Sequence, residues 1–263
     1  MASLPLILEA KDIRAGYGES EVLHGLSLAA HEGEFLGIAG PNGGGKSTFL
    51  RVLAGLLKPN QGSVSLFGHP LSHYPRRRLA QLLAVIFQDF TSLYDFTVFD
   101  MVAMGRSPFV PRWKPLSNDD HHAILNAMET TEVAHLRSRS FSELSAGERQ
   151  RVVIAKALAQ KPSILLLDEP STHLDLHHQV NIFTILRRLN RKNRVTIICI
   201  THDLTLGAQY LDRLLLMNDG LLLAEGNPRD VIQKDLLETI FQTPVSIGTL
   251  VETGTPFVCP VIQ

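Results

Sequence analysis

The sequence predicts an α/β fold in which one α/β core carries a helical insertion. Residues 163–167 and 194–200 are near-continuous apolar runs, which are typical of strands buried on both faces in a helix-covered parallel sheet. A glycine-rich segment, residues 40–45, lies between a strand-like and a helix-like stretch. Between residues 89 and 160 the strand patterns give way to helical segments separated by Pro and Gly.

The N-terminal part is expected to be mostly β structure. Residues 6–13 and 22–28 have strand-like patterns, and residues 16–19 predict a turn between them. The apolar run 34–39 predicts a buried strand, and residues 48–57 follow it with helical spacing.

Further along the chain, residues 63–67 predict another strand and residues 76–83 a short helix. In the insertion, Ser117 to Asp120 predicts a capping box that opens a helix over residues 121–130.

The C-terminal part returns to the α/β pattern. A helical pattern over residues 179–189 lies between the two apolar runs and completes a βαβ unit. Short β-like pieces at residues 214–217 and 221–224 precede a final helix at about residues 231–241. We therefore expect one domain, residues 1–263, with its core at about 1–88 and 161–263 and a helical subdomain at about 89–160.

Composition restricts the class of protein. Hydrophobic residues make up 44% of the 263 residues, enough for a well-filled core, and the net charge is −1. Nucleic acid is not an expected partner, because phosphate contacts require a basic excess. Cys199 and Cys259 cannot form a disulfide framework, which favours a reducing compartment. Cys199 lies in an apolar run and is expected to be buried in the core. We expect no signal peptide, and no apolar run approaches the ~20 residues of a membrane span, so a membrane role would require a partner.

The segment from Gly40 to Ser47 matches the phosphate-loop pattern G-x-x-x-x-G-K-[ST]. Its glycines let backbone N–H groups crowd around phosphate oxygens, and the following helix directs its positive end at the same oxygens. Lys46 would contact the β- and γ-phosphates, and the Ser47 hydroxyl would ligate Mg²⁺. A glycine-rich turn with an exposed lysine is the alternative, but the strand before and the helix after favour phosphate binding.

A carboxylate pair follows the apolar run at residues 164–167. Asp168 is expected at the carboxyl end of this strand, where open α/β sheets bind ligands, and could hold Mg²⁺. Glu169 would be aimed differently and could take a proton from the attacking water. Such a pair alone is usually a solvated loop, but the phosphate loop on the same chain favours the catalytic interpretation.

The segment Leu144-Ser-Ala-Gly-Glu148 resembles the signature sequence of ATP-binding-cassette (ABC) ATPases, usually Leu-Ser-Gly-Gly-Gln. Ala146 and Glu148 depart from the commonest form, but both changes are small. The resemblance covers essentially the whole chain. It implies a P-loop NTPase core with a mixed or parallel sheet, an antiparallel β subdomain and an inserted α-helical subdomain.

The resemblance also assigns roles to residues that would be undistinguished alone. It implies that Gln88 contacts Mg²⁺ and the attacking water, in a loop that faces the membrane partner. It implies that His202 contacts the γ-phosphate and that Tyr17 stacks on adenine. Asp175 would lie in the loop that crosses between paired cassettes.

The expected site uses ATP and Mg²⁺. The expected catalytic residues are Lys46, Gln88, Glu169 and His202, and the expected Mg²⁺ ligands are Ser47, Gln88 and Asp168. The residues expected to bind ATP are Tyr17, Gly40, Pro41, Asn42, Gly43, Gly44, Gly45, Lys46, Ser47, Thr48, Ser145, Ala146, Gly147, Glu148 and Asp175.

The resemblance further implies a homodimer that closes head to tail around two ATP molecules. Each γ-phosphate would lie between one subunit's phosphate loop and the other subunit's Ser145 and Gly147. The cassette is expected at the cytoplasmic face of the membrane. There it would power integral membrane permease subunits and act indirectly with an extracytoplasmic substrate-binding protein.

Weaker features indicate the cargo. Residues 97–109 and the tail segments 217–220, 226–228 and 253–260 resemble importers of iron-siderophore, haem or cobalamin chelates. Importers of zinc, manganese or molybdate are alternatives. A non-transport ABC ATPase acting on DNA or ribosomes is less favoured, because the chain shows no second cassette, long coiled coil or basic arm.

Adjacent histidine pairs at residues 121–122 and 177–178 lack the i, i+4 spacing of a shared metal site. We expect them to form solvated surface.

Overall fold

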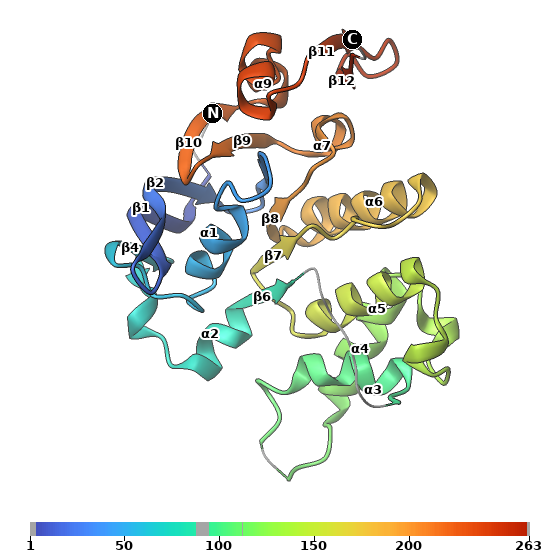
Figure 1. Ribbon diagram of the computed structural model, residues 1–263. Helices are drawn as coiled ribbons and strands as arrows, with labels where there is room; N and C mark the ends of the chain where they lie inside the picture. Colours follow the sequence, from blue (N-terminus) through green and yellow to red (C-terminus); the bar gives the residue numbers. More distant parts are fainter. Residues whose placement is uncertain (1–3, 88–94, 112, 262–263) are drawn as a thin grey trace. The chain divides into compact units, whose positions relative to one another are not determined.

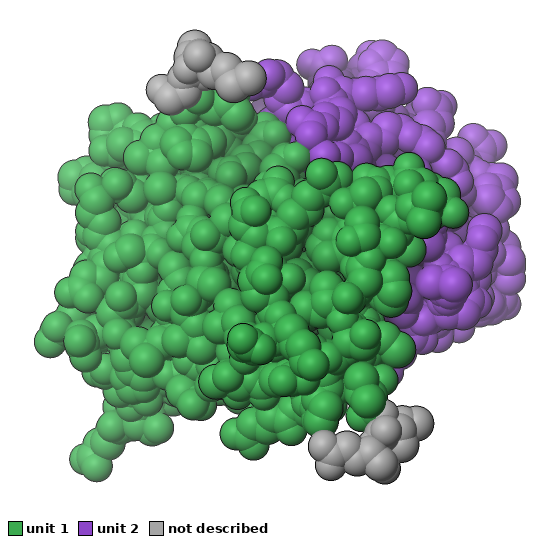
Figure 2. All heavy atoms as spheres, turned by 90° about the horizontal axis from the view of Figure 1, so that it is seen from above, with its two compact units in different colours: residues 1–73, 196–263 green, residues 74–195 purple. Residues whose placement is uncertain are grey.

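The computed structural model describes residues 4–87, 95–111 and 113–261. The chain forms two compact units, unit 1 with residues 1–73 and 196–263 and unit 2 with residues 74–195 (Figure 2). Unit 2 groups the helical stretch with the strands and helices that flank it, and the expected subdomain boundary at residues 89–160 stays a prediction. No helix in the described stretches is long and apolar enough to cross a membrane.

Unit 1 opens with an antiparallel sheet of strand order β2-β1-β4-β5 (Figure 1). Its strands are β1 (Leu6–Tyr17), β2 (Ser20–His31), β4 (Gln61–Leu66) and β5 (His69–Pro70). β1 runs further than expected, so the turn is shorter, and the pairing of Tyr17 with Ser20 closes the hairpin. The implied antiparallel β subdomain is confirmed.

A second set of strands in unit 1 forms the mixed sheet that carries the phosphate loop. The central strand is β3 (Phe35–Ala39), which is parallel to β8 (Thr196–Ile200) and β9 (Arg213–Asn218), and β10 (Leu221–Gly226) is antiparallel to β9. Every residue of β3 and β8 is buried, as the apolar runs predict, including Cys199. Two helices follow strands of this sheet, α1 (Lys46–Leu53) and α7 (Leu204–Tyr210).

The tail of unit 1 differs from the expectation. The predicted final helix is two helices, α8 (Pro228–Val231) and α9 (Lys234–Phe241). The backbone of Ile232 has ψ 83°, outside the helical range, so the chain leaves α8 at this residue before α9 begins. The antiparallel hairpin of β11 (Val245–Thr249) and β12 (Pro256–Pro260) was not expected.

Unit 2 combines a parallel strand pair with helices. The strands are β6 (Leu83–Ile86) and β7 (Ile164–Asp168), and β7 is fully buried. The helices are α2 (Arg76–Leu82), α3 (Val98–Ala103), α4 (Asn118–Thr130), α5 (Ala146–Ala159) and α6 (Leu176–Asn193). The predicted capping box is confirmed, because Ser117 and Asp120 exchange hydrogen bonds at the start of α4.

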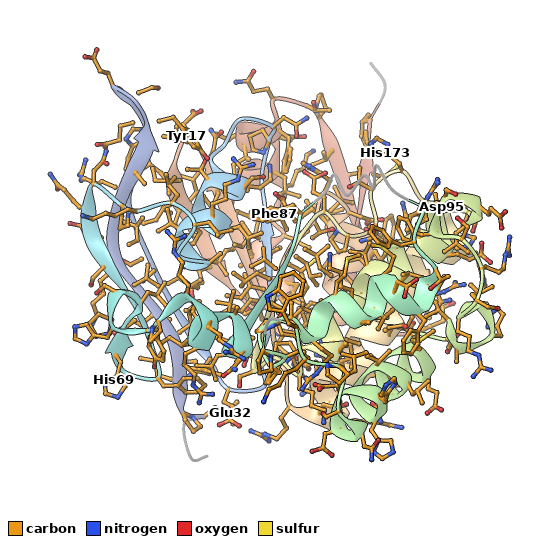
Figure 3. The ribbon with its side chains drawn as sticks, turned by 90° about the horizontal axis from the view of Figure 1, so that it is seen from below. Tyr17, Glu32, His69, Phe87, Asp95 and His173 are labelled. Carbon is orange, nitrogen blue, oxygen red and sulfur yellow. The ribbon has the colours of Figure 1, made fainter. Side chains whose placement is uncertain are left out.

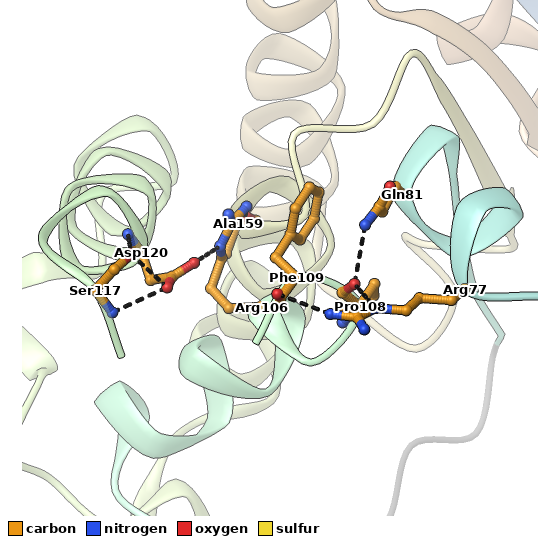
Figure 4. A network of polar contacts seen from close by, with 8 residues as sticks. All are labelled: Arg77, Gln81, Arg106, Pro108, Phe109, Ser117, Asp120 and Ala159. Carbon is orange, nitrogen blue, oxygen red and sulfur yellow. Dashed lines mark hydrogen bonds and ion pairs between the residues drawn. The ribbon is translucent and has the colours of Figure 1, made fainter. Parts of the chain in front are cut away.

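A buried ion pair joins the helices of unit 2 (Figure 4). Arg106 follows α3 and is 6% exposed; its Nε donates to Oδ1 of Asp120 at 2.7 Å, and Nη1 donates to the carbonyl of Ala159 at 2.8 Å. Two side chains of α2 hold the segment just after Arg106. Arg77 donates hydrogen bonds to the carbonyls of Pro108 and Phe109, and Gln81 donates to the carbonyl of Pro108. The break after α3 is therefore a fixed structure rather than a loose loop.

Candidate nucleotide site

The phosphate loop connects β3 to α1 in unit 1. Gly40 has φ +149° and Gly45 has φ +89°, conformations that favour glycine, and a Cβ on Gly40 would overlap the carbonyl oxygen of Met217. Gly43 also has positive φ, but a Cβ there would meet nothing within 4 Å. The loop therefore leaves open space beside its backbone, where a phosphate can approach closely.

Lys46 is buried against this loop, with 5% of its surface exposed. Its ammonium donates to the carbonyls of Gly40 at 2.9 Å and Pro41 at 2.8 Å. The alternative interpretation of this segment, a glycine-rich turn with an exposed lysine, is therefore wrong. Thr48 is buried in the same first turn of α1, and the N-cap position is Gly45, which has no side chain to occupy the helix start.

Tyr17 lies at the end of β1, with 47% of its surface exposed (Figure 3). Its hydroxyl accepts a hydrogen bond from Nη1 of Arg51 at 2.8 Å. Burial raises the pKa of the Tyr17 phenol, but hydrogen bonds from Arg51 and Thr48 outweigh it, so the pKa lies below the ordinary 10.0. Arg51 could not be found from the sequence, because no motif connects β1 to the second turn of α1.

His202 lies just beyond the carboxyl end of β8 and is exposed. It borders a mostly apolar cavity of about 580 Å³ formed by α7, α9 and the tail hairpin. Asp203 caps α7 by accepting the N–H of Leu206 at 2.7 Å, which fixes the backbone next to His202.

Unit 2 contains the acidic residues. Asp168 ends β7 and is 5% exposed, as expected for a carboxylate at a strand end. Glu169 follows with φ +52°, an uncommon conformation for a residue with a Cβ, which turns its side chain away from the direction of the strand. Oε2 of Glu169 accepts a hydrogen bond from the hydroxyl of Thr172 at 3.0 Å. Thr172 was not expected in the site, although its position three residues after Glu169 is a usable signal.

The signature segment begins α5. Ser145 is the N-cap, and a capping box joins it to Glu148, whose Oε2 accepts from the backbone N–H and the hydroxyl of Ser145, each at 2.8 Å. These two hydrogen bonds lower the pKa of Glu148, the backbone bond most. Ser145 and Ala146 are exposed, whereas Gly147 is buried. The pattern S-x-x-E is that of a capping box, so Glu148 stabilises the start of α5. The sequence analysis did not recognise this structural role.

The segment after β7 leads to α6, whose N-cap is Asp175. Oδ1 of Asp175 accepts from the backbone N–H of His178 at 2.9 Å and lies 2.7 Å from its Nδ1. The backbone bond first, and then the ring bond, lower the pKa of Asp175. The expectation of solvated surface holds for His177, which is exposed, but is incomplete for His178, which is half-buried.

The structure thus places the phosphate loop, Tyr17 and His202 in unit 1, and the acidic pair, the signature segment and Asp175 in unit 2. Gln88 lies outside the described residues, so its assignment stays a prediction. The β3–loop–α1 arrangement with a buried lysine defines a P-loop nucleotide-binding protein.

Comparison with known proteins makes the class specific. The family model described as ABC transporter matches residues 23–172. The ferric enterobactin transport ATP-binding protein FepC of Escherichia coli (strain K12) is 37% identical over 253 residues, covering 96% of this chain and 93% of that protein. The hemin import ATP-binding protein HmuV of Thermobifida fusca (strain YX) is 38% identical over 256 residues, covering 97% and 89%.

A solved structure agrees with these relatives. A metal-chelate type ABC transporter in an inward-facing conformation superposes with a TM-score of 0.86 at 26% identity, covering 98% of this chain and 99% of that one. The chain belongs to the ABC transporter family. It is an ATPase that binds and hydrolyses ATP, and the α/β fold expected from its sequence is confirmed.

Proposed function

We propose that this chain is the ATP-hydrolysing subunit of a membrane importer for metal chelates of the iron-siderophore, haem or cobalamin type. The observation that carries the proposal is the likeness to FepC and HmuV, which extends over nearly the whole chain rather than over the nucleotide-binding motifs alone. The metal-chelate type transporter structure supports the same cargo class. In this proposal the cassette works at the cytoplasmic face, bound to permease subunits, and the extracytoplasmic binding protein acts through that permease.

ATP would bind first in unit 1. The open backbone of the loop at Gly43 would cradle the phosphates, and the Lys46 ammonium already lies at the loop's own carbonyls. Because phosphate oxygens carry full negative charge, they are stronger acceptors than those carbonyls. Tyr17 would stack on adenine.

Mg²⁺ fits the oxygen donors that this chain supplies, the Ser47 hydroxyl and the Asp168 carboxylate, since Mg²⁺ prefers oxygen ligands. Bound there, it would neutralise charge on the β- and γ-phosphates. Gln88 is proposed as a further ligand. Glu169, its carboxylate held by Thr172, would take the proton from the attacking water, and His202 would contact the γ-phosphate.

The remaining contacts would come from a second copy of the chain. Ser145 and Ala146 are exposed at the start of α5, so they can face a partner's nucleotide. The positive end of this helix would add to the stabilisation of the γ-phosphate. The site would therefore be complete only in the homodimer.

Uptake measurements in the source organism test the cargo. We expect that deleting the gene abolishes accumulation of one labelled chelate among ferric siderophores, haem and cobalamin, while uptake of zinc, manganese and molybdate stays normal. The wild-type gene would restore uptake, and the Lys46→Ala variant would not. Loss of zinc, manganese or molybdate uptake instead would overturn the proposed cargo class.

A further inference from the structure

His178 connects two segments of unit 2 that the proposed function directs at the same nucleotide. Its Nδ1 donates to Oδ1 of Asp175 at 2.7 Å, in the segment expected to cross between cassettes. Its ring lies against Gly147 of the signature segment, where a Cβ would overlap Cδ2 and lie 2.6 Å from both Cγ and Nε2. One side chain thus touches both segments, although they are far apart in the sequence.

The contact with His178 explains why residue 147 is a glycine, independently of nucleotide binding. Gly147 is buried and has an ordinary helical backbone, so its lack of a side chain is not required by a positive φ. Instead the His178 ring occupies the space that any Cβ would fill. The absence of a side chain at Gly147 therefore lets the His178 ring lie against the start of α5.

Both helix starts are already ordered by their own caps. Ser145 and Glu148 close the capping box of α5, and Asp175 caps α6. These bonds fix each start internally, but they do not connect one start to the other. The His178 ring supplies that connection, because its two edges meet one residue from each.

We propose that His178 is a positioning residue that holds the Asp175 segment against the start of the signature helix. The two segments then meet the partner's nucleotide as one preorganised surface, which reduces the ordering cost of dimer closure. This inference rests on the proposed homodimer, in which the exposed Ser145 faces the ATP of the second copy.

His177 provides a matched control. It is adjacent to His178 and exposed, and its ring lies edge-on to that of His178, with centroids 5.5 Å apart at 82°. A His177→Ala variant removes the same atoms from the same turn of α6 without removing the ring between Gly147 and Asp175.

The test uses the full chain with Glu169→Gln as the parent, so that ATP is bound but hydrolysed slowly. Three variants are added to the parent: His178→Ala, His178→Asn and His177→Ala. Light scattering after size exclusion measures the dimer as a function of ATP concentration with Mg²⁺. Titration of a fluorescent ATP analogue at low protein concentration measures binding to the monomer, and thermal melting measures stability.

We expect His178→Ala to weaken ATP-driven dimerisation by about tenfold, the equivalent of roughly 1.4 kcal/mol, with monomer ATP affinity unchanged. His178→Asn can still donate to Asp175 but loses the ring edge at Gly147, so it would lie between the parent and His178→Ala. His177→Ala would dimerise like the parent.

Normal dimerisation of His178→Ala would overturn the positioning role. So would an equal loss in His177→Ala, or a loss of monomer ATP affinity and melting temperature in parallel with the loss of dimer. A separate variant, Ser145→Arg, tests the proposed homodimer independently of His178. If Ser145→Arg dimerises as well as the parent, the signature segment does not face the partner's nucleotide, and the proposed site shared by two copies is wrong.

Discussion

The hydrogen bond between Arg51 and Tyr17 shows how a single residue can prepare a site for a ligand. Tyr17 is nearly half exposed at the end of β1. Arg51 on α1 holds its hydroxyl at 2.8 Å, and α1 also carries Lys46. The ring proposed to stack on adenine is therefore fixed to the helix that would bind the phosphates.

This bond predicts a loss of affinity that depends on the base. We expect Arg51→Met to weaken ATP binding by about threefold to tenfold, the usual net value of one hydrogen bond, and to leave binding of inorganic triphosphate unchanged. Tyr17→Phe would lose as much, since it keeps the ring but removes the acceptor, and the double variant would lose no more than either one. Isothermal titration with ATP and with triphosphate measures each term. Equal weakening of triphosphate would show that Arg51 acts on the phosphate loop instead.

At the scale of elements, α4 depends on the buried ion pair with Arg106. The hydrogen bond from the hydroxyl of Ser117 lowers the pKa of Asp120 most; burial opposes it, and the hydrogen bond from Arg106 adds to the lowering, so the pKa falls from its ordinary 3.8 to about 2. Because this folded-state pKa is depressed, the ionised Asp120 carboxylate, with its hydrogen bonds from Ser117 and Arg106, stabilises the protein fully above pH 3.8. That stabilisation is lost as the pH falls through about 2.

The corresponding variant is Asp120→Ala, which leaves the Arg106 guanidinium buried without its carboxylate. We expect it to lower the free energy of unfolding near neutral pH by about 3 to 5 kcal/mol, as for other broken buried pairs. Urea unfolding at pH 7 and at decreasing pH measures the difference, which would shrink toward the acid end. Asp119→Ala is the control, because Asp119 is exposed on the same turn of α4. An equal effect of both variants would contradict the role of the pair.

The elements also show what the sequence could predict. The buried strands β3, β7 and β8 were readable because a strand covered on both faces is apolar throughout, and the α4 cap was readable because its residues are three positions apart. The hairpin of β11 and β12 could not be predicted, because two Pro residues in β12 and a Gly in β11 obscure the alternation of apolar and polar residues that marks a strand.

Contacts between distant segments were likewise not readable. His178 meets Gly147, and Arg51 meets Tyr17, across stretches of chain that no motif connects. The residues proposed for the site could be named from the sequence because chemistry fixes their types and spacing. The residues that hold them depend on packing, which a single sequence does not show.

At the scale of the whole molecule, the residues proposed to act in hydrolysis belong to two units of the chain and, in the proposed dimer, to two copies. Unit 1 supplies Lys46, and unit 2 supplies Glu169 and the exposed Ser145. In this proposal, a monomer can bind ATP without completing the site. Binding and hydrolysis become separable steps, and ATP would join the two copies until it is cleaved.

This separation predicts the behaviour of Glu169→Gln. Glutamine keeps the shape of the side chain and an oxygen that can accept from Thr172, but it cannot take the proton from water. We expect ATP affinity to be unchanged and hydrolysis to fall about a hundredfold to ten-thousandfold, the usual contribution of a general base. A stable ATP-bound dimer would therefore accumulate. Phosphate release and light scattering with ATP and Mg²⁺ measure both effects, with Lys46→Ala as the control that forms no dimer because it binds ATP poorly. Hydrolysis by Glu169→Gln at the wild-type rate would show that another group accepts the proton.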